Sequence, residues 1–381
     1  MQPLNQRNNR LLFEFKNKTI LILSPEDWGT NLLSKHLYAQ ELSKHNQVYF
    51  LHTSPHPNQS KFIETSSIQD RLTLIHLKKV VKGIFKLPAF AVDLQNFLII
   101  KKIKKNIPQP VDVVWSFDQS KFQNLRQFNA SVTIFHPVDY IQKATPFLNR
   151  IANSSDVVFS VSEKILDLIT TSTPKHFINH GLDEIFTKKH TSIPTPHFIH
   201  TQQPNVGYVG NLQMKLMDWN ALIKTVQTNP NIHFVFIGPD QPSNIGGSKT
   251  FAELDTIKSF PNTYFTGSMS KKELASVLPL FDAFLMSYDH QKYPIHVSNS
   301  HKILEYLSTG KTIVSNFTST YSSYSLLEMV EQNNLLPDKL ATVIQNLNQY
   351  NVIEKQKERM KYALDNTYPK QISRIEKLLH S

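Results

Sequence analysis

Lys302 and Glu305 stand three residues apart in the stretch 298–316, "SNSHKILEYLSTGKTIVSN". In a helix, this spacing places both side chains on one face. A lysine in the first helical turn opposes the helix dipole, and a bound anion would remove that conflict. The N–H groups of residues 300–302 and the Lys302 ammonium would then bind a phosphate, while the Glu305 carboxylate accepts hydrogen bonds from two sugar hydroxyls. The spacing alone leaves an ordinary surface ion pair as the alternative.

This arrangement requires a helix that begins just before Lys302. His301 is its expected first residue, and Gly310 ends it before a β-branched run at 312–316. Three apolar residues at helical spacing supply the buried stripe. The side chains suited to the N-cap are those of Ser298, Asn299 and Ser300.

Short β-branched runs alternate with helical patterns along the whole chain, which indicates parallel α/β domains. Helical patterns cover 31–44 and 163–170, among others. The strands expected in the first half are 19–24, 47–52, 72–77, 112–117, 131–136 and 156–161, and those in the second half are 206–210, 233–238, 263–267, 283–288 and 312–316.

A chain of 381 residues is long enough for two domains. The stretch 187–204 is polar, contains proline and lacks periodicity, which is typical of a linker. We therefore expect a first domain over 1–195 and a second over 196–365. The remaining helix, 366–381, is expected to pack back on the first domain.

The composition excludes several classes of protein. The sequence has no cysteine, which excludes disulfides, Cys-ligated zinc and a catalytic thiol. No apolar run approaches the ~18 residues of a membrane-spanning helix, and the N-terminus lacks the apolar region of a signal peptide. No Asp-x-Asp pair or zinc-binding His pair indicates a metal site. We therefore expect a cytoplasmic protein, soluble or peripheral on the inner face of the cell membrane.

The positive charge of the chain is concentrated in its first half. Residues 1–190 contain 24 Lys and Arg against 15 Asp and Glu, whereas the remainder contains 17 against 15. Residues 76–106 carry eight lysines among large apolar side chains, with Asp93 as the single acid. Such a segment suits an anionic membrane surface, although a surface helix with a solvated lysine face is the plainer alternative. Nucleic acid is not expected, because no base-stacking platform or binding motif is present.

Gly210 follows the expected strand 206–210 and leads through a short polar loop into a helix near Asp218. Glycine lets a ligand approach the backbone closely, and the start of a helix favours an anion. A tight turn without a ligand is the alternative. Dinucleotide-binding and P-loop glycine motifs are both absent.

The stretch 298–316 resembles the donor-binding segment of retaining glycosyltransferases with the GT-B architecture, in particular family 4. In that family a Lys, a Glu-Tyr-Leu and a Gly-Lys-x-x-Val follow one another in this way. The resemblance implies an α/β fold of two Rossmann-like, doubly wound domains facing a central cleft. Further stretches resemble the family in the same order, namely "SDVVFSVSEKIL" with "FINHGLDEIF", "VGYVGNL", "HFVFIGP", "YFTGSMSKKELASVLPLFDAFLMSY" and "DNTYPKQISRIEKLL".

The resemblance implies donor-binding roles for individual residues. Glu305 matches the second Glu of the family's Glu-x7-Glu motif, which implies a contact with the ribose of a nucleotide-sugar. Val297 stands in place of the first Glu, so His296, Ser298 or backbone groups would hold the transferred sugar. Together with the residues argued above, the expected donor-binding set is Glu305, Lys302, His301, Ser300, Gly210, Asn211, Lys215, Gly267 and Met269.

Several members of this set depart from the family pattern or act through backbone groups. Asn211 stands where many relatives have a diphosphate-binding Arg, and Lys215 matches the accompanying Lys only loosely. More of the diphosphate charge would therefore fall on Lys302. The loop containing Gly267 and Met269 resembles the family's base-contacting loop.

Two segments of the first half resemble segments of the family, one that faces the sugar and one that receives acceptor and phosphate groups. "FHPVDY" implies that His136 or Asp139 forms hydrogen bonds with donor or acceptor hydroxyls, and these two are the expected catalytic side chains. A structural role is the alternative for a histidine at a strand end. The loop "SPEDWGTN" implies an acceptor-side contact by Trp28, Gly29 and Thr30, although Asp27 and Trp28 also suit a helix cap and a core anchor.

The activity implied is a hexosyltransferase-type glycosyl transfer in cell-surface polysaccharide synthesis. A nucleotide-sugar donor would give its sugar, with retention, to a glycan or lipid-linked acceptor. No cofactor and no obligatory metal are expected, because charge stabilisation and positioning suffice for a good leaving group. Two alternatives stay open: a nucleotide-sugar epimerase on the same scaffold, and a non-catalytic relative that binds nucleotide-sugars.

Overall fold

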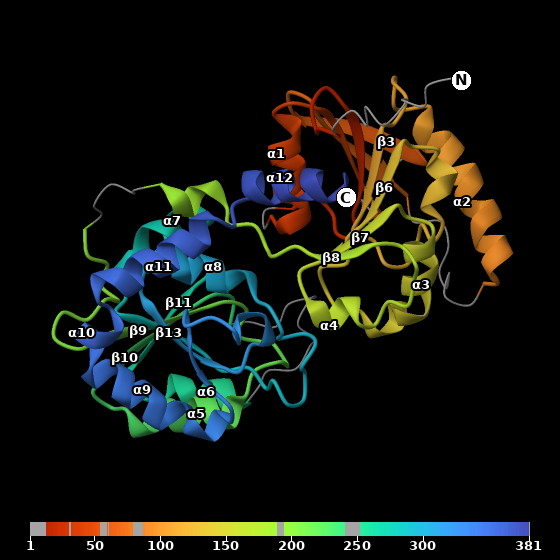
Figure 1. The fold of residues 1–381 in the computed structure, drawn as a ribbon. Coiled ribbons are helices and arrows are strands. Elements are labelled where there is room, and N and C mark those ends of the chain that lie inside the picture. The colour runs from red at the N-terminus through yellow and green to blue at the C-terminus, as the bar shows by residue number, and fades with distance from the viewer. Residues whose placement is uncertain are drawn as a thin grey trace, which may run out of the picture. The chain divides into compact units, whose positions relative to one another are not determined.

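The computed structural model describes residues 13–29, 32–53, 59, 61–78, 87–188, 194–240 and 252–380. The chain divides into two compact units, Met1–Asn179 with Tyr368–Ser381, and His180–Thr367. Each unit is a β-sheet between helices (Figure 1). The first crossing between units comes earlier than the expected residue 195. The segment just after this crossing belongs to the second unit, because η4 (Glu184–Thr187) packs against helices α7 (Lys271–Val277) and α8 (His301–Ser308) of that unit.

Within the described residues, the first unit has an eight-stranded sheet in the order β3-β4-β2-β1-β5-β6-β7-β8. All neighbouring strands are parallel except β3 and β4. The expected strands of this half are confirmed, and their central residues are buried on both faces. The strands are β1 (Thr19–Leu23), β2 (Gln47–His52), β3 (Ile63–Gln69), β4 (Leu72–Leu77), β5 (Val113–Ser116), β6 (Val132–Phe135), β7 (Val157–Ser160) and β8 (Lys175–Phe177).

Helices cover both faces of the first sheet, as in a doubly wound domain. Side chains of α1 and α12 join one core, and side chains of α2 and α3 join the other. Helix α12 packs against α1, where the Tyr38 and Tyr368 rings meet edge to face at 4.9 Å. The last helix of the chain therefore belongs to the first unit. These helices are α1 (Ser34–Ser43), α2 (Ala89–Lys104), α3 (Thr145–Asn153), α4 (Glu163–Leu166) and α12 (Tyr368–Leu378).

The second unit, within its described residues, has a six-stranded parallel sheet in the order β11-β10-β9-β12-β13-β14. The chain order reverses direction between β9 and β12, which makes their carboxyl ends the topological switch point of this unit. The five strands expected from the sequence are confirmed. The strands are β9 (Asn205–Val209), β10 (His233–Ile237), β11 (Thr263–Gly267), β12 (Ala283–Met286), β13 (Thr312–Asn316) and β14 (Glu328–Val330).

The helices of the second unit enclose its sheet and share one continuous core with it. On one side α5 packs against α6 and α9, and elsewhere α8 packs against α11 (Figure 1). The expected helix after Ser300 is confirmed, and Gly310 follows its end with a φ of +77°. The helices are α5 (Trp219–Thr228), α6 (Ala252–Lys258), α7 (Lys271–Val277), α8 (His301–Ser308), α9 (Leu336–Gln345), α10 (Leu347–Tyr350) and α11 (Ile353–Leu364).

Candidate functional site

Three glycines end three neighbouring strands of the second sheet. Gly210, Gly238 and Gly267 follow or end β9, β10 and β11, with φ values of +146°, +147° and +74°. The N–H of Gly238 donates to the carbonyl of Gly267 at 2.9 Å, and a Cβ on Gly238 would lie 2.0 Å from the Gly210 carbonyl oxygen. Only glycine fits so close an approach. Gly238 was not among the sequence candidates, although the repeated strand-Gly pattern was a signal for it.

Lys302 is buried beneath this row, with 7% of its surface exposed. Its ammonium donates to the Tyr288 hydroxyl at 2.6 Å and lies 5.1 Å from the centroid of the Tyr208 ring. A Cβ on Gly210 would lie 2.0 Å from the Lys302 Nζ, so the ammonium lies against the backbone of the residue that follows β9. Among the described residues, no carboxylate forms an ion pair with it. A buried cation in this setting favours an anionic ligand.

Tyr306 fixes helix α8 to the end of β9. Its hydroxyl accepts a hydrogen bond from the backbone N–H of Val209 at 2.7 Å, and its ring stacks on Phe284 of β12 at 4.1 Å. The second turn of α8 is thereby attached to β9 and β12. Ser300 is the N-cap residue, but its side chain does not cap the helix. The Ser300 side chain therefore leaves the first N–H groups of α8 uncapped.

Glu305 lies one turn deeper in α8 and is partly buried. Burial raises the pKa of the Glu305 carboxyl to about 7, while Lys271 and Lys302 oppose the shift and Asp183 adds to it. Lys271 opens α7 just after the Gly267 loop and forms an ion pair with Asp183 at 2.9 Å. Lys271 is not among the donor-binding residues expected from the sequence. Its signal was the capping box of Ser270, which places the lysine at the first position of a helix after a strand-end glycine.

His301 and His180 lie close together at the start of α8, with ring centroids 6.0 Å apart. Burial lowers the pKa of His180 to about 4, so its imidazole is neutral. Val297, which stands in place of the family's first Glu, is 5% exposed and belongs to the core of the second unit. Of the expected substitutes, His296 is exposed, whereas the Ser298 hydroxyl donates to the Ile295 carbonyl at 2.7 Å.

The remaining donor candidates occupy the loops beside the glycine row. The Asn211 side chain accepts the backbone N–H of Gln213 at 2.8 Å, so it shapes the loop after β9. Lys215 is exposed in the same loop. Met269 packs its side chain against the core, and Gly267 has open space where a side chain would be. The structure thus gathers the candidates of the second unit at one edge of its sheet.

His136 in the first unit is fully buried, with no exposed surface. Its ring stacks on Phe117 at 5.1 Å and on Trp115 at 6.0 Å, and the Trp115 Nε1–H donates to its Nδ1 at 3.3 Å. The side chain points into the core of the unit. This burial favours the structural alternative for His136, and its contact with a sugar hydroxyl stays a prediction.

The other candidates of the first unit have mixed placements. Asp139 is exposed, and its backbone carbonyl accepts a hydrogen bond from Gln119 at 2.6 Å. Trp28 packs edge to face on Phe50 at 4.9 Å and is partly buried, as expected of a core anchor. Gly29 is exposed, with no atom within 4 Å of a Cβ position. Thr30 lies outside the described residues.

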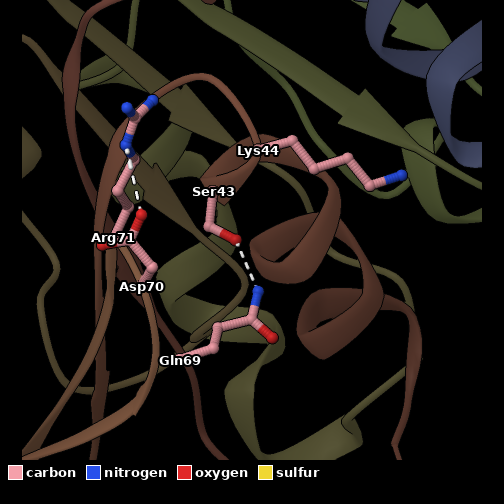
Figure 2. A pocket seen from close by; sticks show the side chains of 5 residues that line it. All are labelled: Ser43, Lys44, Gln69, Asp70 and Arg71. Carbon is pink, nitrogen blue, oxygen red and sulfur yellow. Dashed lines mark hydrogen bonds and ion pairs between the residues drawn. The ribbon is translucent and has the colours of Figure 1, made fainter.

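A hollow of about 390 Å³ lies elsewhere in the first unit (Figure 2). Ser43 and Lys44 at the end of α1 line one side, and Gln69, Asp70 and Arg71 of the β3–β4 turn line the other. The Arg71 carbonyl accepts from Val48 at the start of β2, so the hollow is at the amino ends of the strands. Ligands of such sheets bind at the carboxyl ends, and we therefore do not assign this hollow to the candidate site.

Neither a metal cluster nor a membrane span occurs in the part of the chain that the structure describes. No three His, Asp or Glu side chains there are grouped as metal ligands. No helix there is long and apolar enough to cross a bilayer.

Sequence comparisons and structure comparisons gave different outcomes. No protein-family model matches the sequence, and no curated protein does. Among solved structures, the E. coli trehalose-6-phosphate protein bound with UDP-2-fluoro glucose is 12% identical, with a TM-score of 0.70 over 95% of this chain and 98% of that one. Sucrose-phosphate synthase from Thermosynechococcus elongatus is 11% identical, with a TM-score of 0.67 over 96% and 98%. Anabaena HepE in complex with UDP-glucose is 12% identical, with a TM-score of 0.65 over 96% and 100%.

These neighbours establish the fold. The chain has the GT-B architecture, with two Rossmann-like units, as the sequence resemblance implied. Identities of this size carry no residue-level assignment. The chemistry must therefore be argued from the residues at the edge of the second sheet.

Proposed function

We propose that the protein is a glycosyltransferase that moves a sugar from a nucleotide-diphosphate donor to a hydroxyl of a glycan or lipid-linked acceptor. The observation that carries the proposal is Lys302, a buried cation that forms no ion pair with a carboxylate among the described residues and lies against Gly210 at the switch point. The diphosphate of a bound donor supplies an anionic partner for the Lys302 ammonium. Two of the structural neighbours hold UDP-sugars, so UDP-glucose is the first donor to try.

Each group of the site has a role in the proposed reaction. The bond between the anomeric carbon and the diphosphate oxygen breaks, the acceptor hydroxyl forms the new bond to that carbon, and its proton passes to the departing diphosphate. Lys302 and the start of α8 stabilise the charge on the departing diphosphate. The Glu305 carboxylate accepts hydrogen bonds from the ribose hydroxyls, and the bare backbone at Gly267 admits the base.

Finer features of the proposal rest on the sequence resemblance. We propose retention of anomeric configuration and a family 4-like assignment on the order of the motifs around Glu305. We also propose cell-surface polysaccharide synthesis at the inner face of the cell membrane. No obligatory metal is proposed, because Lys302 and the helix start supply positive charge; activity is therefore expected to survive a chelator.

A non-catalytic relative that binds nucleotide-sugars is the second candidate. It is favoured by Val297, whose burial in the core leaves no carboxylate where family 4 enzymes hold the transferred sugar. Such a protein would bind donor without releasing nucleotide.

The test is incubation of the full chain with UDP-, GDP-, ADP-, CDP- and dTDP-sugars, with and without oligosaccharide and polyprenyl-phosphate acceptors. Acceptor-dependent release of nucleoside diphosphate from wild type, and its loss in Glu305→Ala, is the expected result. Binding of a donor without release would support the non-catalytic candidate. Conversion of the donor sugar without any acceptor would support an epimerase, and absence of both binding and turnover would overturn the proposal.

A further inference from the structure

Helix α2 carries two apolar faces where folding needs one. Its inner face packs into the core of the first unit through buried residues at helical spacing: Val92, Asn96, Ile99, Ile100 and Ile103. The opposite face carries Phe90, Leu94, Phe97 and Leu98, which are 76%, 63%, 43% and 54% exposed. These four, called the outer stripe below, follow the i, i+4, i+7, i+8 pattern of one helix face. Single exposed apolar residues are ordinary, but a contiguous stripe of four indicates a binding surface.

Positive charge continues the outer stripe toward the end of the helix. Lys101, Lys102 and Lys105, called the lysine end below, are all exposed. The Lys101 ammonium lies 4.5 Å from the centroid of the Phe97 ring, which joins the two regions. Asp93, the single acid of the helix, is neutralised by Arg150 at 2.6 Å. The exposed face of α2 is therefore apolar at one end and cationic at the other.

The plainer explanation covers only half of this surface. Lysines in the last turn of a helix complement its dipole and need no partner. The outer stripe has no such explanation, because the core of the first unit is already filled by the inner face of α2. Figure 1 shows α2 (orange) running along the outside of the first unit.

We propose that the outer stripe and the lysine end form a docking surface for an anionic lipid bilayer. The helix is about 24 Å long and would lie flat, with the outer stripe entering the boundary between headgroups and acyl chains. The lysine end would contact lipid phosphates. Charge decides the occupant, because a protein partner with an apolar groove would not require three cations beside the stripe. The proposal stands independently of the nucleotide site of the second unit.

The test is sedimentation of the full chain with vesicles of phosphatidylcholine alone and of phosphatidylcholine mixed with phosphatidylglycerol. Binding is expected to rise with the anionic lipid and to fall as salt is added. Phe90→Gln with Leu94→Gln should weaken binding at least tenfold, and each of Lys101→Gln and Lys102→Gln about fivefold. Ile353→Gln with Lys357→Gln changes an exposed apolar residue and an exposed lysine on α11 and should leave binding unchanged.

Two outcomes would overturn the proposal. The first is equal binding to neutral and anionic vesicles, or binding that the α2 variants do not change. The second is a wild-type dimer in lipid-free sedimentation equilibrium that Phe90→Gln with Leu94→Gln converts to a monomer, since the stripe would then be a self-association surface. All the variants alter exposed side chains, so their thermal midpoints and nucleotide binding should match wild type. If wild type binds no nucleotide, the proposed function is wrong, and the lipid result still stands.

Discussion

A Cβ atom on Gly210 would lie 2.0 Å from the Nζ of Lys302. The end of β9 and the first turn of α8 are therefore fitted to one another, and the Lys302 ammonium can occupy this position because residue 210 has no side chain. This contact brings the glycine row and the cation of the candidate site together.

Gly210→Ala is expected to destabilise the second unit by about 1–3 kcal/mol and to abolish nucleotide binding. The backbone φ of +146° at this position is unfavourable for alanine, and the new methyl group would displace the Lys302 ammonium. Denaturant unfolding and calorimetric titration with UDP measure the two effects. Gly29→Ala is the control for stability, because nothing lies within 4 Å of its Cβ position. Unchanged nucleotide affinity in Gly210→Ala would show that Gly210 is not part of the nucleotide-binding site.

Tyr306→Phe should lower the free energy of unfolding by about 1–3 kcal/mol, because it leaves the buried N–H of Val209 without its acceptor. We expect nucleotide affinity to fall as well, since the second turn of α8, which includes Glu305, is no longer fixed to the end of β9. Tyr324→Phe removes a hydroxyl from a half-exposed tyrosine and should change neither quantity. Equal stability of the two variants would show that the Tyr306 contact does not hold the helix.

Glu305 gives nucleotide binding a distinct pH dependence. Its carboxyl has a pKa of about 7 and must be ionised to accept two ribose hydroxyls. Wild-type affinity should therefore rise as pH increases through that value and level off above it, by at most about tenfold per pH unit. Titration calorimetry on Glu305→Gln is the control for the nucleotide's own phosphate ionisation, and the Glu305-dependent part of the rise should be missing there. Identical pH profiles of wild type and Glu305→Gln would show that Glu305 does not contact the ribose.

The same pKa shift affects stability in the opposite direction. Because the folded-state pKa of Glu305 is raised from 4.5 to about 7, its stabilising effect is complete below 4.5 and is lost as pH rises through 7. Without ligand, the wild-type thermal midpoint should therefore decline relative to that of Glu305→Gln over this range. A constant difference between the two midpoints would contradict the shift.

His136→Ala is expected to act on the first unit alone. Removing a fully buried ring from the aromatic stack with Trp115 and Phe117 should cost about 3 kcal/mol of unfolding free energy. Nucleotide affinity in the second unit should stay at the wild-type value. His45→Ala, at an exposed position of the same unit, should be within about 0.5 kcal/mol of wild type. A stable His136→Ala would restore His136 as a candidate for chemistry.

Much of the fold could be predicted because the central strands are short, buried runs of β-branched residues. Strands such as β1 and β10 are apolar on both faces, which parallel sheets require. Strand β3 was missed because "IETSSIQ" is polar and exposed, and it joins the sheet only as an antiparallel edge. The three-residue edge strands β8 and β14 are too short to give a periodic signal.

The part of the candidate site that lies on one helix and on the strand ends could be predicted from the sequence. The spacing of Lys302 and Glu305 and the helix from His301 to Gly310 were local features. The ion pair of Lys271 with Asp183 joins residues 88 positions apart, so only tertiary folding brings it to the site. The sequence predicted that His136 lies at the end of a strand, but it did not predict that the side chain points into the core.

The most direct test of the central claim is thermal unfolding with UDP, GDP, ADP, CDP and dTDP, on wild type and on Lys302→Met. Methionine keeps the length of the buried side chain and removes its charge. At 100 times its dissociation constant, a nucleotide should stabilise wild type by about 2.7 kcal/mol and raise the midpoint by several degrees. We predict that one nucleotide does so and that Lys302→Met stays folded without responding. An equal rise in both proteins, or no rise with any nucleotide, would contradict the assignment of Lys302 to the diphosphate site.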